Sequence, residues 1–202
     1  MRVRVLSRAA VEAGAAEGVD AIISIRSTAL ERCEDLELAV QQAVLGDMQA
    51  ALVQRFDDIG ILAYGPYRRP TMEDLAIALD FARAVRDRIP EGVLAVHCQH
   101  GVSRSAAVAL AIIADEAGPG AEANAVAALL RQDDDARMQP NPLIVSLADA
   151  ALFRYGHLGA ALAAVCARYV AWRDYWRDIA LDPGAYWEQA RRVRLRPRRR
   201  EV

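Results

Sequence analysis

The chain has 202 residues and a net charge of −2, a length that suits a single domain with at most a small appendage. Its apolar stretches are too short to cross a bilayer, and residues 1–6 alternate arginine with valine, unlike the apolar core of a secretory signal. We therefore expect no membrane span. The three cysteines, Cys33, Cys98 and Cys166, are widely spaced and follow no disulfide framework, so we expect a reducing, cytoplasmic location.

The charge is unevenly distributed along the chain. Residues 191–202 carry seven arginines and one glutamate, a local charge of +6, so the other residues sum to −8. Such a basic segment binds nucleic acid, anionic lipid or an acidic partner in some proteins and is simply solvated in others. We expect one domain over residues 1–182 and an Arg-rich tail over 183–202, and we do not expect nucleic acid as a partner.

Strand-like and helix-like segments alternate along the chain. Apolar, β-rich runs predict strands, and capped stretches with apolar residues at helical spacing predict helices. In chain order the predicted elements are a strand at 2–6, a helix at 8–16, a strand at 20–25, a helix at 35–49, a strand at 52–56, a helix at 71–90, a strand at 93–96, and helices at 106–114, 121–132 and 142–155. This order predicts an α/β fold with a central, mostly parallel sheet of four to five strands flanked by helices.

One further helix is predicted from about residue 158 onward. Its apolar residues recur at alternating spacings of four and three, which is a heptad pattern. They are Leu158, Leu162, Val165, Tyr169, Trp172, Trp176 and Ile179. This helix, Leu158 to Ile179, packs against the rest of the domain or, because tryptophans are frequent interface anchors, provides a surface for self-association. The sequence leaves both alternatives open.

The most informative segment follows the predicted strand at 93–96. It reads His97-Cys98-Gln99-His100-Gly101-Val102-Ser103-Arg104-Ser105 and leads directly into the apolar helix at 106–114. A turn between a strand and a helix directs backbone N–H groups toward one centre, and the helix adds the positive end of its dipole, so this loop is suited to bind phosphate. A thiolate is favoured in the same place, because helix N-termini and guanidinium groups stabilise it.

The residue types in this segment have separate roles in such a site. Cys98 is the candidate nucleophile, and Arg104 is placed to clamp two phosphate oxygens with its planar fork. Gly101 permits a positive φ in a tight loop, and Ser105 can donate its hydroxyl to the sulfur when the sulfur leaves a phosphorylated intermediate. His97 is expected to shape the loop rather than touch substrate. Further backbone N–H groups for the phosphate come from Gln99, His100, Val102 and Ser103.

This segment resembles the signature of the cysteine-based protein tyrosine phosphatase superfamily, which is His-Cys, five residues, Arg, then Ser or Thr. His97, Cys98, Arg104 and Ser105 match every specified position. The resemblance implies a phosphatase-like catalytic domain of the dual-specificity-like branch, of bacterial type, that uses a cysteinyl-phosphate intermediate and neither metal nor other cofactor. The pair Pro140-Asn141 also resembles one that compact members of this branch often carry before a late helix, where we expect Asn141 to act as a cap.

In such a phosphatase the leaving group needs a proton from an acid, and a base must later activate the water molecule that hydrolyses the phosphoenzyme. One carboxyl group can fill both roles. In the dual-specificity-like branch the acid follows a strand in a Phe-x-Asp context, which Phe56-Asp57-Asp58 resembles. Asp58 is therefore the candidate acid. Asp57, Asp47 and Asp74 are alternatives, although the position of Asp74 at a helix start already explains it.

The separation between Asp58 and Cys98 is 40 residues, longer than is usual in that branch, so we expect residues 64–70 to absorb the excess as an extended loop. Tyr64 and Tyr67 in this loop either wall a deep slot for phosphotyrosine or pack against the domain. The resemblance implies a phosphorylated protein as the first substrate, with a small phosphate monoester, an inositol phosphate, a nucleotide or an RNA phosphate as alternatives. A catalytically weak or inactive phosphate-binding module is the competing interpretation.

Overall fold

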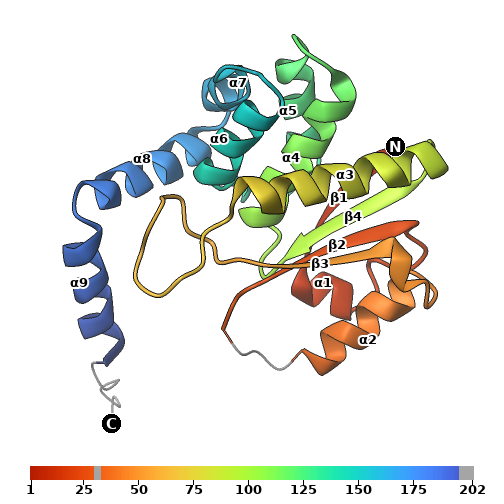
Figure 1. Ribbon diagram of the computed structural model, residues 1–202, viewed down its shortest axis with the longest axis horizontal. Helices are drawn as coiled ribbons and strands as arrows, with labels where there is room; N and C mark the ends of the chain where they lie inside the picture. Colours follow the sequence, from red (N-terminus) through yellow and green to blue (C-terminus); the bar gives the residue numbers. More distant parts are fainter. Residues whose placement is uncertain (30–32, 196–202) are drawn as a thin grey trace.

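A computed structural model describes residues 1–29 and 33–195 of the chain. Its centre is a four-stranded sheet, entirely parallel, with the strand order β1-β4-β2-β3 (Figure 1). The strands are β1 (Arg2–Ser7), β2 (Ala21–Arg26), β3 (Ala51–Arg55) and β4 (Val93–Cys98). The predicted α/β class is confirmed, and each predicted strand is present.

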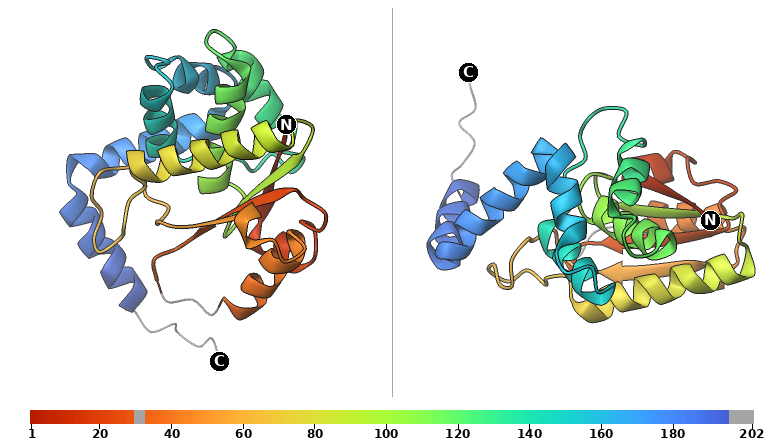
Figure 2. Two further views of the ribbon diagram at one scale, coloured as in Figure 1. Left: turned by 45° about the vertical axis from the view of Figure 1, so that its right-hand side comes forward. Right: turned by 90° about the horizontal axis from the view of Figure 1, so that it is seen from above.

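Helices cover both faces of this sheet. In chain order they are α1 (Arg8–Glu12), α2 (Glu34–Ala43), the short 3₁₀ helix η1 (Met48–Ala50), α3 (Met72–Arg88), α4 (Arg104–Ala117), α5 (Glu122–Leu130), α6 (Pro142–Ala151), α7 (His157–Val165), α8 (Ala167–Leu181) and α9 (Pro183–Leu195). The first two, α1 and α2, lie on one face, and α3 to α6 lie on the other. The last two, α8 and α9, extend past the carboxyl ends of the strands (Figures 1 and 2).

The position of β4 follows from its sequence. It lies between β1 and β2, and its residues from Leu94 to Cys98 are buried, as expected for the inner strand of a parallel sheet with helices on both faces. Helix α4 packs on β4 and β1, and its residues Ala106, Ala107, Ala109 and Ala111 are fully buried. Because α4 begins at Arg104, six residues after β4 ends at Cys98, its N-terminus lies close to the end of β4.

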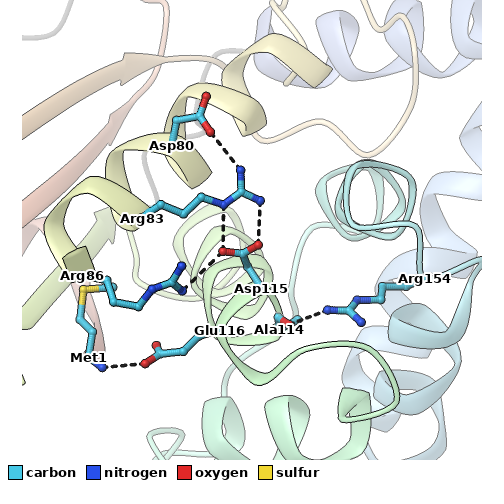
Figure 3. A network of polar contacts seen from close by, with 8 residues as sticks. All are labelled: Met1, Asp80, Arg83, Arg86, Ala114, Asp115, Glu116 and Arg154. Carbon is cyan, nitrogen blue, oxygen red and sulfur yellow. Dashed lines mark hydrogen bonds and ion pairs between the residues drawn. The ribbon is translucent and has the colours of Figure 1, made fainter. Parts of the chain in front are cut away.

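Ion pairs and a carbonyl contact fix the opposite end of α4 (Figure 3). From α3, Arg83 donates to Asp115 through Nε at 3.1 Å and Nη2 at 2.7 Å, and Arg86 lies 3.6 Å from the same carboxylate. On the other side of the helix, Arg154 donates to the Ala114 carbonyl at 2.8 Å. A bidentate pair of this kind adds geometric specificity, so α4 is held firmly behind the loop that precedes it.

Helix α3 begins with a reciprocal cap. The Thr71 hydroxyl accepts from the Asp74 amide at 3.2 Å, and the Asp74 carboxylate accepts from the Thr71 amide at 2.9 Å. This capping box satisfies two backbone donors that a helix start leaves without partners. The expected helix start is therefore confirmed.

A glutamine side chain occupies part of the outer edge of β1. Gln132, beyond the end of α5, accepts from the Val5 amide at 3.0 Å and donates to the Val3 carbonyl at 3.0 Å. One side-chain amide therefore makes the two hydrogen bonds that a neighbouring strand would make at these positions.

Four predicted helices differ from the structure, and the one predicted at 142–155 ends at Ala151, before Phe153 at a φ of +53°. The helix predicted at 8–16 ends at Glu12, before Gly14 at a φ of +84°, and the one predicted at 35–49 ends at Ala43, before Gly46 at +82°. Both glycines take the left-handed backbone that a right-handed helix cannot continue through.

The single helix predicted over 158–179 is wrong. The chain breaks at Cys166, whose φ of −122° and ψ of 90° are extended, into the separate helices α7 and α8. Val165, a member of the predicted heptad seam, is the last residue of α7 and is 66% exposed. The seam is therefore not continuous, and self-association through it stays a prediction.

The C-terminal segment is helical as far as residue 195. Residues 183–195 of the predicted Arg-rich tail form α9, and residues 196–202 lie outside the described part of the chain. The division of the chain at residue 182 stays a prediction. Across residues 1–29 and 33–195, no helix combines the length and the apolar character needed to cross a membrane.

Candidate active site

The 97–105 loop joins β4 to α4 at the carboxyl end of the sheet. Cys98 is the last residue of β4 and is 3% exposed, and Arg104 is the first residue of α4. The Cys98 sulfur lies 3.1 Å from the Ser105 hydroxyl oxygen. The Ser103 side chain makes no capping hydrogen bond to α4, so it does not compete with an anion for the N–H groups of the first turn.

The backbone of β1 lies directly against this loop. Gly101 has a φ of +71°, and a Cβ atom there would lie 2.8 Å from the Ser7 nitrogen and 2.9 Å from the Leu6 carbonyl carbon. Any other residue would be strained in the backbone and would clash with β1. The amide of Arg8 donates to the Gln99 carbonyl at 3.3 Å, which ties the two segments together. The role predicted for the glycine is thus supported by two separate constraints.

The segment before α6 binds the loop from the other side. The amides of Gln139 and Asn141 donate to the carbonyls of Val102 and Ser103 at 3.1 and 3.3 Å. In a trans peptide the carbonyl and the following N–H point in opposite directions. The N–H groups of Ser103 and Arg104 therefore point away from this segment, toward the interior of the loop.

The guanidinium group of Arg104 is buried and oriented by two acceptors. Its Nη1 donates to the Phe56 carbonyl at 2.8 Å and to the Ser27 hydroxyl at 3.4 Å. Its Nε is buried and has no partner in the described part of the chain. One edge of the guanidinium is therefore fixed, and the edge formed by Nε and Nη2 is left to bind an oxyanion. A narrow recess at this point is lined by Cys98, Arg104, Ser27 and Arg26 among others.

Asp58 lies beside the 97–105 loop. Its Oδ1 accepts from the Ser103 hydroxyl at 2.8 Å and from the Asn141 side-chain amide at 2.8 Å. The carboxyl group is half-buried. The carboxyl group that the sequence analysis selected is thus brought next to the loop from a position 40 residues earlier in the chain.

Asp57 is held away from the loop by other partners. This buried carboxylate accepts from the Thr28 amide at 3.1 Å, from the Thr28 hydroxyl, and from the Arg68 amide at 2.9 Å. Its hydrogen bonds join the segment after β2 to the end of the 57–70 loop. The arrangement favours a structural role for Asp57.

The other two carboxylates considered have local roles. Asp74 completes the cap of α3 and also pairs with Arg68 at 2.8 Å. Asp47 accepts from the Gln49 amide at 3.0 Å in the turn before β3.

Asn141 has a second function that the sequence analysis missed. As predicted, its side-chain oxygen caps α6 by accepting from the amides of Leu143 and Ile144 at 3.0 and 3.1 Å. Its side-chain nitrogen donates to Asp58 and, at 3.1 Å, to the Ile59 carbonyl. Full burial of an asparagine that uses both ends of its amide makes it a rigid link between α6 and Asp58. The Pro140-Asn141-Pro142 motif was the available signal, but nothing in it named Asp58 as a partner.

His97 is a neutral, buried residue next to Cys98. Its side chain is 1% exposed, and both ring nitrogens lack hydrogen-bond partners in the described part of the chain. Burial lowers the pKa of His97 to about 4, and the nearby charges of Arg26 and Arg8 act in the same direction. Because His97 also lines the recess beside Cys98, the expectation that it shapes the loop without touching substrate stays a prediction. His100 is exposed.

Tyr64 and Tyr67 pack against the C-terminal helices. Their rings contact Trp176 and Trp187, and neither tyrosine lines the recess beside Cys98. Of the two alternatives for these residues, packing against the domain is the one observed.

Comparisons with known proteins identify related folds. No protein-family model matches the sequence, and no curated protein matches it. The chain is similar to the crystal structure of Tk-PTP in the active form, with a TM-score of 0.49 and 14% identity, over 76% of this chain and 93% of that one. It is also similar to PTPMT1 (TM-score 0.48, 16% identity, 81% and 95% covered) and to PTPMT1 in complex with PI(5)P (0.46, 15%, 79% and 93%). The function is therefore argued from the site itself.

Proposed function

We propose that the protein is a phosphatase that hydrolyses phosphate monoesters through a cysteinyl-phosphate intermediate. The observation that carries this proposal is the placement of three groups at one loop. Cys98 and Arg104 line the same narrow recess, and the Asp58 carboxyl accepts a hydrogen bond from Ser103 of the same loop. A nucleophile, an oxyanion clamp and an acid are what phosphoryl transfer to a cysteine requires.

In the first step the Cys98 thiolate attacks phosphorus, and the bond between phosphorus and the leaving oxygen breaks. Inward N–H groups of the loop and the Arg104 edge hold the phosphoryl oxygens. Asp58 gives its proton to the leaving oxygen. Because its Oδ1 already accepts two hydrogen bonds, the transferable proton belongs on Oδ2.

In the second step the roles of the carboxyl group reverse. Asp58, now ionised, takes a proton from a water molecule, which attacks the phosphocysteine and releases inorganic phosphate. The bond between phosphorus and sulfur breaks, and Cys98 returns to the thiolate. The Ser105 hydroxyl, 3.1 Å from the sulfur, donates a hydrogen bond to it as negative charge develops. The cycle consumes one water molecule and needs no cofactor.

For the substrate we propose phosphotyrosine in a protein, handled by a cytoplasmic, bacterial enzyme of the dual-specificity-like kind. The support is the signature from His97 to Ser105 and the chemistry of a buried nucleophile reached through a narrow recess. Inositol, nucleotide and RNA phosphates are the competing substrates, and a substrate panel separates them.

The test is hydrolysis of p-nitrophenyl phosphate and of a phosphotyrosine peptide by the wild type, Cys98→Ser and Cys166→Ser. Cys166 is a matched control because it is equally buried and donates to the Met138 carbonyl, away from the recess. We expect Cys98→Ser to lose all measurable activity and Cys166→Ser to keep it. Full activity of Cys98→Ser would refute the mechanism, and phosphate binding by a wild type without turnover would favour the inactive module instead.

A further inference from the structure

The 57–70 loop, which carries Asp58, packs against the C-terminal helices through an aromatic cluster. We define the cluster as Tyr64 and Tyr67 from the loop, Trp172 and Trp176 from α8, and Trp187 from α9. Figure 2 shows the loop beside α8 and α9 in both views, beyond the carboxyl ends of the strands. The cluster is therefore close to the candidate site but outside its recess.

The loop and the helices meet edge to face. The Tyr64 ring centroid lies 5.6 Å from that of Trp176 and 5.6 Å from that of Trp187, and the Tyr67 centroid lies 5.6 Å from that of Trp187. The planes are nearly perpendicular, which is a favoured geometry for aromatic pairs. The indole N–H groups of Trp172 and Trp176 are buried without hydrogen-bond partners in the described residues. Ring packing therefore holds these two indoles in the cluster.

Two glycines bring the loop backbone into direct contact with the indole rings. A Cβ atom at Gly60 would lie 2.4 Å from Trp176, and one at Gly65 would lie 2.6 Å from Trp187. At distances this short, a side chain at either position would force the loop and the indole apart. The 57–70 loop thus contacts Trp176 and Trp187 with its backbone as well as with its tyrosine rings.

The cluster is joined to Asp58 by only two residues. Ile59 is buried and packs with Trp176, and Gly60 follows it against the same ring. At the other side of the loop, the Asp57 amide donates to the Arg68 carbonyl at 2.7 Å and closes the base. A displacement of the loop from the helices would therefore be transmitted to Asp58 through a short, closed piece of chain.

We propose that Trp176 and Trp187 are positioning residues for Asp58, so that proton donation to the leaving group depends on the C-terminal helices. The inference rests on the proposed phosphatase function. Without the helices, the loop would keep the contacts of Asp57 and the hydrogen bonds from Ser103 and Asn141 to Oδ1 of Asp58. It would lose the surface that sets its path from Ile59 onward, and the direction of Asp58 Oδ2 toward the leaving oxygen would no longer be fixed. A purely stabilising role for α8 and α9 predicts no such selective effect.

The dependence of the rate on the leaving group separates the two roles. Phenol has a pKa near the value of about 10 for tyrosine and leaves poorly without a proton, whereas p-nitrophenol is far more acidic and needs little donation. We therefore measure kcat/KM for phenyl phosphate and p-nitrophenyl phosphate, together with inhibition by inorganic phosphate. The variants are Trp187→Ala, Trp187→Phe and the matched control Tyr186→Ala. Tyr186 is the adjacent, exposed residue of α9 and makes no ring contact in the described structure.

We expect Trp187→Ala to lower kcat/KM for phenyl phosphate by about 100-fold, the loss that a misplacement of about 1 Å produces. The value for p-nitrophenyl phosphate should change only a few-fold, and inhibition by phosphate should stay the same. Trp187→Phe should recover most of the loss because it keeps a ring in the contact, and Tyr186→Ala should match the wild type. Gly60→Ala tests the contact with Trp176 from the loop side and should show the same selective loss.

The inference would be overturned if kcat/KM fell equally for phenyl phosphate and p-nitrophenyl phosphate. It would also be overturned if the ratio of the two kcat/KM values were that of the wild type in both Trp187→Ala and Gly60→Ala. If Trp187→Ala does not fold, Gly60→Ala decides the question alone. A wild type that hydrolyses neither substrate would instead refute the proposed function.

Discussion

The 97–105 loop and the 57–70 loop meet at the hydrogen bond between Ser103 and Asp58, but they are built differently. The first is contiguous in sequence, lies between a buried strand and its helix, and is shaped by backbone hydrogen bonds from Arg8, Gln139 and Asn141. The second is long, and its path is set by contacts with Thr28, Ser103 and the aromatic cluster. The anion-binding groups therefore come from one short stretch of sequence, whereas the proton donor is brought to them by tertiary packing.

The two neighbouring aspartates give the largest expected contrast within the 57–70 loop. Asp58→Asn removes the proton donor and should lower kcat/KM for phenyl phosphate by about 10² to 10⁴-fold. Asp57→Asn weakens charge-assisted hydrogen bonds to Thr28 and Arg68 and should lower the free energy of unfolding by about 1.5–3 kcal/mol. Steady-state kinetics and urea unfolding of both variants provide the check. A selective loss of phenyl phosphate hydrolysis in Asp57→Asn alone would reverse the assignment.

Arg104→Lys tests whether the 97–105 loop needs the guanidinium fork rather than a positive charge. Lysine cannot contact the Phe56 carbonyl and two phosphoryl oxygens at once. We expect kcat/KM to fall by about 10² to 10³-fold for both aryl phosphates, as on the loss of one transition-state donor. A loss of kcat/KM that is the same for phenyl phosphate and p-nitrophenyl phosphate distinguishes Arg104→Lys from the variants of the 57–70 loop. Activity near that of the wild type would show that charge alone suffices.

His97 makes the free energy of unfolding of the protein depend on pH. Its pKa is lowered from the ordinary 6.5 to about 4, so below pH 6.5 the unfolded chain binds a proton that the folded chain resists. The folded state is therefore destabilised as pH falls from 6.5 to 4 and is unaffected by His97 above 6.5. Between pH 7 and pH 5 the cost is about 2 kcal/mol.

The measurement is the free energy of unfolding in urea at pH 7 and pH 5 for the wild type and for His97→Gln. The wild type should lose about 2 kcal/mol more than the variant over this interval, because other titrating groups are common to both. Equal losses would show that the imidazole accepts its proton in the folded state at an ordinary pH.

The smallest expected effect lies at the far end of the 57–70 loop. Thr71→Ala removes the hydroxyl that caps α3 and should lower the free energy of unfolding by about 1 kcal/mol. Activity should be almost unchanged, because the contacts of Asp57 with Arg68 remain. Thr71→Ser, which keeps the cap, is the control, and chemical denaturation reports both. A large loss of activity would mean that α3 positions Asp58 as well.

The sequence predicted the parallel sheet and the geometry of Gly101 because both depend on local signals. Strand β4 is a continuous apolar run followed at once by a turn with a glycine, and that pattern specifies a buried strand ending in a tight loop. Asp58 was predicted as the acid because Phe56-Asp57-Asp58 resembles a Phe-x-Asp context after a strand, and this assignment stays a prediction. The different surroundings of Asp57 and Asp58 depend on Thr28 and Asn141, which no local sequence pattern connects to them.

The C-terminal helices are the part of the fold that the sequence pattern predicted wrongly. The spacing of apolar residues from Leu158 to Ile179 fits one long helix, but the chain breaks at Cys166, where no glycine or proline marks an end. Trp172 and Trp176 therefore lie on α8, which is separate from α7 and packs against the 57–70 loop. Trp172 and Trp176 were considered as anchors for self-association, and in the structure they pack within the chain. Gly60, which contacts Trp176, could not be predicted as a partner because a glycine carries no hydrophobic signal.

The hydrogen bonds of Gln132 to the edge of β1 have a consequence for the behaviour of the protein at high concentration. A free parallel edge offers donors and acceptors to any extended chain and is a template for aggregation. Here the amide of one glutamine occupies the positions at Val3 and Val5 that an incoming strand would need. Growth of the sheet beyond β1 would first have to displace this side chain, so solubility during synthesis and storage depends in part on a residue far from the chemistry.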